Sequence, residues 1–363
     1  MRRTNPLIVG GGPAGAAAAM HLLDAGIKPI VIERQAAGRD ALCGGFLSWR
    51  TVEMLETLGI SRDLLKGHDV NSLRIFSGGH CHELPLPVPA IAVSRQRLDL
   101  LLLTEAERRG AVVRRGVPAQ AFVKGHIQLD SGELLTGDGL FLATGKHDLR
   151  GLPRPKDAVG KDPMLGLRLR MTPSDRLMQR LGSYIEMHLF KGGYLGVVLQ
   201  ENESANFCMA VRKSRLAAAK GSPAILFAQL ADENPALGER LSALTATQHV
   251  DAIGRVPYGW RATGTQPGVF RLGDQAGVIP SLAGEGIGIA LASAQCAIRH
   301  WREGGSAAAP AYQHAFARQM RRPIAVAELV SGLARHPVST TLALSLIARF
   351  PGALRLIAGA TRI

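Results

Sequence analysis

The sequence LIVGGGPAG, which runs from Leu7 to Gly15, decides the fold of this chain. The apolar residues 7–9 predict a buried parallel strand, and the glycines that follow predict a tight turn. An alanine-rich segment, 14–25, then predicts a helix, and residues 29–32 predict a second apolar strand that ends at Glu33. This order of strand, turn, helix and strand is the setting in which a G-x-G-x-x-G motif binds a dinucleotide.

The glycines of the motif have separate physical roles. Gly10 permits the tight turn, Gly12 lets the backbone approach a pyrophosphate, and Gly15 lets the helix pack closely on the strand. The helix begins around Pro13 and Ala14, where free N–H groups and the positive end of the helix dipole favour phosphates. We therefore expect a diphosphate at this turn.

The residues after the second strand fit the rest of a dinucleotide. The carboxylate of Glu33 can accept both hydroxyls of an adenosine ribose, and its charge disfavours a 2′-phosphate and therefore NADP at this site. Arg34 or Arg39 could pair with the pyrophosphate. A glycine-bearing loop follows, which contains Cys43, Gly44, Gly45 and Phe46. Its glycines let the backbone approach a flat or bulky group. Cys43 is either a functional thiol or a small buried apolar side chain.

Composition bounds the class of protein. The chain has 363 residues, of which 46% are apolar and 20% are charged, as in a folded protein of one or two domains. Its four cysteines are scattered without a C-x-x-C pair, which favours a reducing compartment and disfavours a zinc site. Because the N-terminus leads directly into the first strand and carries no signal-peptide pattern, we expect a cytoplasmic protein. The histidines show no ligand spacing, so we assign no metal.

The formal net charge of +14 has several explanations. The basic residues are dispersed and aromatic residues are only 5%, so we expect no nucleic-acid partner. A membrane surface, an acidic substrate or a solvated basic surface remain open. Residues 337–363 predict two short basic amphipathic helices, which either make peripheral membrane contact, close a pocket for an apolar substrate, or simply pack on the domain.

The middle of the chain predicts a second domain. Apolar strands at 72–77 and 82–88 leave the βαβ rhythm, and further strands over 165–211 with a helical segment at 223–244 predict an antiparallel sheet covered by helices. We therefore predict an α/β protein with a discontinuous nucleotide-binding domain, an interleaved substrate-binding domain and a C-terminal helical segment. The predicted boundaries are 1–70, 90–152 and 257–320 for the first domain, 71–89 and 153–256 for the second, and 321–363 for the last.

Two later elements complete the predicted nucleotide-binding domain. A buried strand at 139–143 ends in Thr144 and Gly145, which should lie beside the first glycine turn. A further strand ends in Gly273 and Asp274 and leads through the glycine-rich loop 280–288 into a small-residue helix. A carboxylate there can bind a polyol, and a helix N-terminus stabilises a ring edge that becomes anionic on reduction. These are requirements of a flavin, and NAD alone has no need for them.

These blocks, in this order, resemble the flavoprotein superfamily of para-hydroxybenzoate hydroxylase, the flavin-dependent halogenases and geranylgeranyl reductase. The likeness covers most of residues 7–300, and it implies a Rossmann-like FAD-binding domain of the GR2 type. It also implies that Glu33 binds the adenosine ribose, that Arg95 or Gln96 lies along the FAD, and that Asp274 binds the ribityl hydroxyls. The predicted cofactor site is Gly10, Gly12, Pro13, Ala14, Gly15, Glu33, Arg34, Arg95, Gln96, Thr144, Gly145, Gly273, Asp274, Gly284, Gly286 and Ile287, and the predicted substrate pocket is Gly44, Gly45, Phe46, Tyr194 and Pro280.

Departures from the family pattern restrict the function. The Asp-Gly pair that hydroxylases of this superfamily carry at the end of the middle strand is replaced by Ala143, Thr144 and Gly145, so NAD(P)H is a candidate electron donor without a recognisable motif. The halogenase motif Trp-x-Trp-x-Ile-Pro is absent, which disfavours halogenation. The segment 192–196 looks most like geranylgeranyl reductase, but only Tyr194 of the aromatic motif of prenyl reductases is kept.

Three functional hypotheses remain. The first is monooxygenation of an apolar aromatic, polyketide-like or lipid-like substrate by reduced flavin and O₂. The second is reduction of an isoprenoid double bond, with Cys43 as a candidate proton donor and Tyr194 as a candidate catalytic or wall residue. The third is a flavin-bearing redox or lipid-binding partner that turns over no substrate of its own.

Overall fold

The computed structural model describes residues 5–242, 249–334 and 359–362. Its first sheet is parallel and five-stranded, in the order β16-β10-β1-β2-β6. The bounds are β1 Leu7–Val9, β2 Ile30–Glu33, β6 Val112–Arg115, β10 Leu140–Leu142 and β16 Val269–Arg271. The central strands β1 and β10 are buried on both faces, which explains why they are continuous apolar runs.

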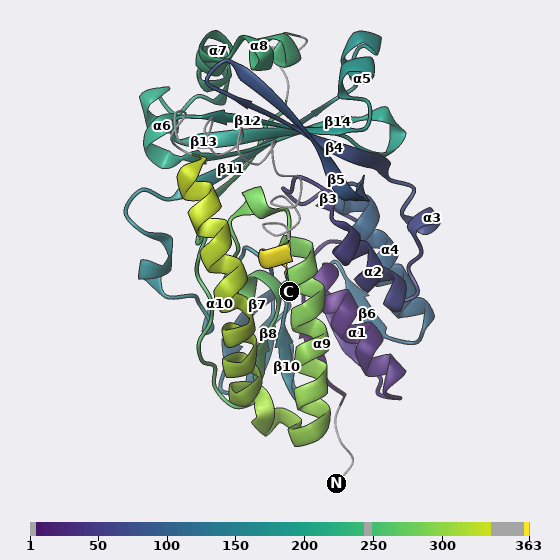
Figure 1. Ribbon diagram of the computed structural model, residues 1–363. Coiled ribbons are helices and arrows are strands. Elements are labelled where there is room, and N and C mark those ends of the chain that lie inside the picture. The colour runs from purple at the N-terminus through teal and green to yellow at the C-terminus, as the bar shows by residue number, and fades with distance from the viewer. Residues whose placement is uncertain (1–4, 243–248, 335–358, 363) are drawn as a thin grey trace.

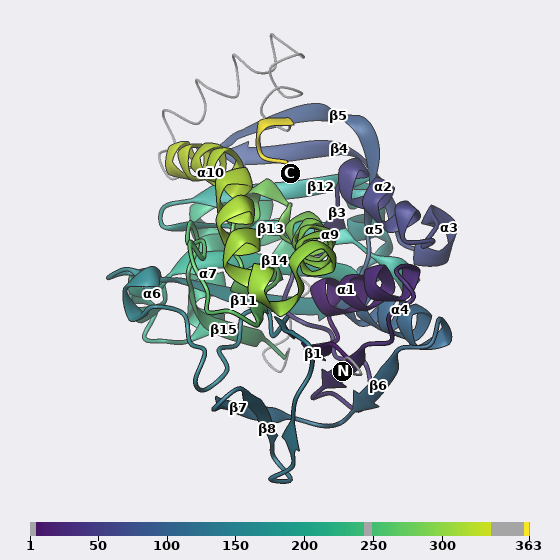
Figure 2. The ribbon, with the colours of Figure 1, turned by 90° about the horizontal axis from the view of Figure 1, so that it is seen from below.

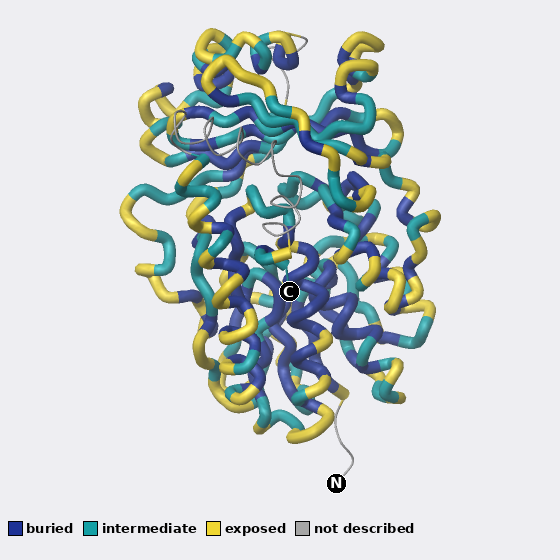
Figure 3. Tube along the Cα trace, viewed as in Figure 1, coloured by how far each residue is buried: buried dark blue, intermediate teal, exposed yellow. Residues whose placement is uncertain are grey.

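The two faces of the parallel sheet have different covers (Figure 2). Ile8, Phe141 and Phe270 point to a core shared with the helices α1 Pro13–Asp24, α4 Arg95–Arg108, α9 Gly286–Gly304 and α10 Ala309–Leu333. Leu7 and Val9 point to the other face, against a three-stranded sheet of β7 Ala119–Val123, β8 His126–Leu129 and β9 Leu134–Leu135. Successive side chains along β1 therefore pack into two different cores. Figure 3 shows buried residues in dark blue along α1 and α9, which belong to the core that contains Ile8.

The second sheet is eight-stranded, in the order β15-β11-β14-β13-β12-β4-β5-β3. Its strands are β3 Phe46–Leu47, β4 His68–Ser77, β5 His80–Ala92, β11 Met164–Met171, β12 Tyr184–Phe190, β13 Gly193–Leu199, β14 Ala205–Arg212 and β15 Asp251–Val256. Figure 1 shows α5 Asp175–Leu181, α7 Pro223–Glu233 and α8 Pro235–Leu241 on its outer face, and α6 Lys213–Ala218 at its edge. Its inner face looks toward the parallel sheet, so the space between the two sheets is where a site can form.

The second sheet is largely antiparallel, as expected, and is mixed because one pair of strands is parallel. β12 pairs in parallel with β4, with Tyr184 opposite Ser72. The remaining paired strands of this sheet run antiparallel. This parallel pair joins the β4–β5 hairpin, from an earlier part of the chain, to the strands β11 to β14 that come later.

N-cap residues set where several helices begin. α4 begins at Arg95, because Ser94 caps it by accepting a hydrogen bond from the Arg97 N–H. The predicted helical segment 223–244 is broken at Asn234, which caps α8 while Pro235 starts it. α2 Trp49–Thr57 has Ser48 as its N-cap, and a short helix, α3 Arg62–Leu65, follows it.

The domain boundaries remain a prediction. The second sheet begins with β3 and continues through β5 as far as Ala92, and β15 was not predicted. α10 runs through residue 320 as one helix, and its buried Tyr312, Phe316 and Met320 belong to the core of α1 and α9. The predicted amphipathic helices of 337–363 lie almost wholly outside the described residues.

Candidate functional site

The first glycine turn is held against the end of β10. Gly10 has φ +106°, and a Cβ there would lie 2.3 Å from the carbonyl oxygen of Ala143. A Cβ on Gly15 would lie 1.8 Å from the carbonyl oxygen of Gly10. Only glycine fits either position, and the contact brings Thr144 and Gly145 beside the turn, as the sequence predicted.

Glu33 lies at the end of β2, on the rim of the same turn. Its Oε2 accepts a hydrogen bond from the Gly11 N–H at 2.6 Å, and its Oε1 accepts one from the Gln35 N–H at 2.8 Å. These two bonds fix the carboxylate so that its remaining lone pairs face the cleft. That geometry suits a pair of vicinal hydroxyls.

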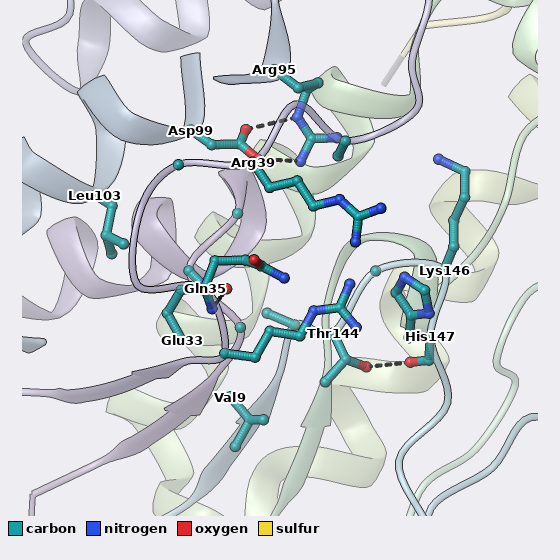
Figure 4. Close-up of a pocket in the computed structure, with 18 of the residues that line it drawn as sticks. Val9, Glu33, Gln35, Arg39, Arg95, Asp99, Leu103, Thr144, Lys146 and His147 are labelled. Atoms are coloured by element: carbon teal, nitrogen blue, oxygen red, sulfur yellow. Dashed lines mark hydrogen bonds and ion pairs between the residues drawn. The ribbon is translucent and has the colours of Figure 1, made fainter. Parts of the chain in front are cut away.

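Beside this turn lies a cleft of about 470 Å³ with basic side chains on its walls (Figure 4). Arg34, Arg39, Lys146 and His147 line it. Burial, together with the positive charges of Arg34 and Lys146, lowers the pKa of His147. An anion is the ligand that would relieve this crowding of positive charge.

Arg95 lies on α4 at the inner end of the cleft. It forms a two-point ion pair with Asp99, with Nε to Oδ1 and Nη2 to Oδ2 both at 2.7 Å. A Cβ on Gly12 would lie 3.3 Å from Arg95 Nη2, so the guanidinium lies beside the turn. Asp99 orients Arg95, and the cleft therefore has a positioned cation where the phosphates are expected.

Asp274 reaches the cleft from the far end of the sequence. It follows β16, and its Oδ2 lies 3.6 Å from the Nζ of Lys146. The preceding Gly273 packs against the first turn of α1, where a Cβ on Gly273 would lie 3.2 Å from the Cβ of Ala14. The early and late glycine elements thus meet, as the sequence analysis required.

A second cavity, of about 460 Å³, continues from the first. Gly12, Arg95, Gly145, Lys146 and Asp274 line both spaces. Beyond these residues a large part of the wall is aliphatic and comes from the inner face of the second sheet; this part includes Leu73, Ile75, Leu84, Leu86, Ile185, Met187 and Leu189. The arrangement is a polar cleft that opens into an apolar chamber.

The loop that carries Cys43 is clamped by strands of the second sheet. The buried Arg168 on β11 donates to the carbonyl oxygens of Asp40 at 2.9 Å and Ala41 at 3.1 Å. Asn206 on β14 donates from Nδ2 to the carbonyl oxygens of Cys43 at 3.2 Å and Gly44 at 2.9 Å. This clamp positions the Cys43 thiol on the wall of the apolar chamber.

The predicted site residues fall into three groups. Those that line the polar cleft are Gly10, Gly12, Glu33, Arg34, Arg95, Thr144, Gly145 and Asp274. Those that line the apolar chamber include Pro13, Ala14, Cys43, Gly44, Gly45, Phe46, Tyr194, Gly273, Gly284, Gly286 and Ile287. Gln96, Gly15 and Pro280 line neither space: the Gln96 N–H donates to Asp40 Oδ1 at 3.2 Å, Gly15 packs on Gly10, and Pro280 lines a smaller neighbouring cavity.

Sequence reasoning missed several residues of the site. Lys146 directly follows the predicted Thr144 and Gly145, so its position in the chain was a usable signal. Arg168 and Asn206 carried no such signal, because they contact the Cys43 loop only once two distant strands pack on it.

Comparison with known proteins supports the cofactor that this geometry suits. Residues 3–131 match the family model described as FAD binding domain. Menaquinone reductase of Mycolicibacterium smegmatis is 27% identical over 325 residues, which is 84% of this chain and 77% of that protein. These matches identify the chain as an FAD-dependent oxidoreductase with an FAD-binding domain that includes residues 3–131.

Solved structures show the same fold. The flavin-dependent brominase Bmp2 matches with a TM-score of 0.78 at 14% identity, over 99% of this chain and 94% of that chain. A geranylgeranyl bacteriochlorophyll reductase-like protein of Thermoplasma acidophilum matches with a TM-score of 0.71 at 19% identity, over 98% of this chain and 91% of that chain. In the part of the FAD-dependent oxidoreductase that the structure describes, no helix has the length and apolar character to span a membrane.

The residues present fit FAD. The fixed Glu33 carboxylate suits the adenosine ribose, and the glycine turn with Arg95 and Lys146 suits the diphosphate. Asp274 then suits the ribityl chain. The N-terminus of α9 at Gly286 lines the chamber, where it suits the flavin ring.

Proposed function

We propose that this protein is a flavin-dependent reductase of a carbon–carbon double bond in the isoprenoid chain of a lipid. The observation that carries the proposal is the direct continuation of the FAD cleft into a chamber walled by aliphatic side chains of β4, β5 and β12. The menaquinone reductase that aligns with most of the chain supports reduction. Monooxygenation, the first hypothesis from the sequence, has weaker support, because the relative that covers most of the chain is named a reductase.

The chamber walls bind the substrate and exclude water. Leu73, Ile75 and Met187 offer no hydrogen-bonding group, so an isoprenoid chain loses little by leaving a lipid phase for this space. Bound FAD in its reduced state supplies a hydride equivalent. The aliphatic wall then holds the double bond, and the exclusion of water limits competing reactions of the reduced cofactor.

Reduction of a double bond also needs one proton, which this chain must deliver. Hydride adds to one carbon, a new C–H bond forms at the other carbon, and the proton comes from an X–H group of the protein that solvent later protonates again. Cys43 lines the chamber, and its Sγ accepts a hydrogen bond from the Gly45 N–H at 3.4 Å, which leaves its own proton available. We propose Cys43 as this donor.

Cys208 is a second thiol on the same wall. Burial raises the pKa of Cys208 to about 12, so this thiol keeps its proton at neutral pH. Substitution can separate the contributions of Cys43 and Cys208, because the two thiols lie on different elements. Cys43 lies on a loop held through its backbone by Asn206, and Cys208 lies on the strand β14.

The test uses the FAD-loaded protein, reduced anaerobically and mixed with a prenylated quinone. The products are extracted, oxidised in air so that any quinol returns to quinone, and analysed by mass spectrometry. A mass gain of two hydrogens that survives air oxidation places the new bonds in the chain. A gain that air oxidation removes shows ring reduction, and a gain of one oxygen in the presence of O₂ shows monooxygenation; either result alone overturns the proposal.

Substitution of the thiols completes the test. We expect Cys43→Ala to slow reoxidation of the reduced flavin by the substrate at least tenfold while FAD still binds, and Cys208→Ala to slow it less. Cys81→Ala is the matched control, because Cys81 is exposed on the β4–β5 hairpin and lines neither the cleft nor the chamber. An unchanged rate in Cys43→Ala would remove the thiol from the proposal.

A further inference from the structure

Three hydroxyl groups from separate elements meet on one wall of the apolar chamber. Tyr194 lies on β13, Tyr258 follows β15, and Ser281 lies in the short turn before α9. The hydroxyls of Tyr258 and Ser281 are 2.8 Å apart, and the hydroxyl of Tyr194 also hydrogen-bonds to Ser281 Oγ. Ser281 is therefore the centre of a hydroxyl cluster formed by these three residues.

The hydroxyl cluster has one more O–H donor than its internal hydrogen bonds use. Burial raises the pKa of both Tyr194 and Tyr258, so all three groups are protonated at neutral pH. Three O–H groups supply three donors, and the two hydrogen bonds within the cluster use two of them, whichever atom donates in each bond. No further acceptor for these hydroxyls lies among the residues for which the structure gives side chains. One donor is left for a ligand.

The cluster also lies where the chamber adjoins a smaller cavity of about 230 Å³. Tyr194, Tyr258 and Ser281 line both spaces. The chamber takes an apolar chain, and the smaller cavity has room for a compact group at the end of such a chain. Because all three hydroxyl-bearing residues line both spaces, the unused donor is available at the boundary between them, whichever residue carries it.

The charge of the smaller cavity restricts that group. Asp162 and Glu328 line it, and its described lining contains no lysine or arginine, although the chain as a whole has a net charge of +14. Asp162 forms an ion pair with Arg212 at 3.4 Å. For Glu328, the contacts among the described residues include no cation. A phosphate or diphosphate would be repelled here, whereas a neutral oxygen acceptor would not.

We infer that the hydroxyl cluster binds a carbonyl oxygen on a neutral ring of the substrate, with the ring in the smaller cavity and the isoprenoid chain in the chamber. The inference rests on the proposed function and deepens it. It assigns a ring-bearing lipid, such as a prenylated quinone, as the substrate class, and it excludes prenyl diphosphates. Ser281, Tyr194 and Tyr258 are then specificity-determining residues.

The test measures binding to the oxidised FAD-loaded protein, without turnover. The probes are a prenylated quinone, a prenyl hydrocarbon of the same chain length and the corresponding prenyl diphosphate. We expect Ser281→Ala to weaken binding of the quinone about tenfold, which corresponds to about 1.4 kcal/mol, and to leave binding of the hydrocarbon unchanged. Tyr258→Phe should act in the same direction, and Ser281→Thr, which keeps the hydroxyl, should restore the affinity.

Tyr184→Phe is the matched control, because the Tyr184 hydroxyl bonds to Glu83 at 3.1 Å and lies outside both cavity linings. An equal loss of affinity for quinone and hydrocarbon, or tighter binding of the diphosphate than of the quinone, would overturn the inference. So would a Ser281→Ala variant with an altered flavin potential and unchanged lipid affinity, since the hydroxyl would then belong to the cofactor. Failure of the proposed function is a separate outcome, seen as no chain reduction by the unaltered protein.

Discussion

The Nζ of Lys146 lies 3.6 Å from Oδ2 of Asp274, although 127 residues separate them and they follow different strands of the parallel sheet. Burial acts to lower the pKa of Lys146, but the charge of Asp274, with smaller contributions from Cys43 and Tyr258, raises the pKa on balance. The pair lies where the polar cleft passes into the apolar chamber. It therefore joins the predicted diphosphate site to the predicted ribityl site.

Loss of the Lys146 charge should weaken cofactor binding. In Lys146→Met the cleft loses a cation near the expected diphosphate, and Asp274 loses its partner. We expect the dissociation constant for FAD to rise about tenfold, as for one partly exposed charge-assisted contact. Fluorescence titration of the apoprotein with FAD measures this, with the exposed Lys191→Met as control. Equal affinities in the two variants would show that Lys146 does not contact the cofactor.

Substitution of Gly10 should abolish FAD binding. A Cβ in Gly10→Ala would lie 2.3 Å from the Ala143 carbonyl oxygen, so the strands β1 and β10 must separate. Gly125→Ala is the control, because Gly125 also has a positive φ, +87°, but its Cβ would meet nothing within 4 Å. The control should cost about 1 kcal/mol of stability from backbone strain alone and keep FAD. Retention of FAD by Gly10→Ala would contradict the close approach.

The Cys43 loop should loosen when its clamp is removed. Asn206→Ala deletes the two hydrogen bonds to the carbonyl oxygens of Cys43 and Gly44. In a background in which the exposed Cys81 is replaced by serine, we expect alkylation of Cys43 to accelerate several-fold, because the loop opens more often. Mass spectrometry of the alkylated peptide gives the rate. Identical rates with and without the Asn206 amide would mean that other contacts hold the loop.

A buried ionic cluster on the outer face of the second sheet should make stability depend on pH. Glu186 is fully buried and accepts hydrogen bonds from Arg240 at 2.9 Å, from Arg74 at 3.0 Å and from His188 at 3.2 Å. Burial acts to raise the pKa of Glu186, but the hydrogen bonds from His188 and Arg240 outweigh it and lower the pKa to about 2. The unfolded chain has the ordinary value of 4.5, so the folded state binds fewer protons at this group.

The sign of the effect follows from that lowered pKa. The stabilisation by Glu186 is complete above about pH 4.5 and is lost as the pH falls through 2. Glu186→Gln should therefore lower the free energy of unfolding by about 3 kcal/mol at pH 7, with the deficit shrinking between pH 4.5 and 2. Denaturant titrations at several pH values measure it, and Glu133→Gln on the surface should change little. A deficit that is constant from pH 7 to pH 2 would assign the effect to packing.

The nucleotide-binding part of this fold is predictable from local sequence, because each of its signals is contiguous. The apolar strand 7–9, the turn at Gly10 and Gly12, the helix that follows and the acid at Glu33 are all set by nearest-neighbour backbone chemistry. The same holds for Gly273 and Asp274 at a strand end. Chain-local patterns also predicted most strands of the second sheet, but not β3 or β15, and not that β12 would pair in parallel with β4.

What only the tertiary structure decided is which distant side chains share a space. The Lys146–Asp274 pair, the Asn206 clamp and the meeting of Tyr194, Tyr258 and Ser281 each join segments that no periodicity connects. The physical reason is that a strand pattern specifies which face a side chain occupies, whereas the packing of one sheet over another specifies what it faces. The FAD-binding domain is therefore predictable from local sequence patterns, whereas the shape of the substrate chamber follows from how the two sheets pack.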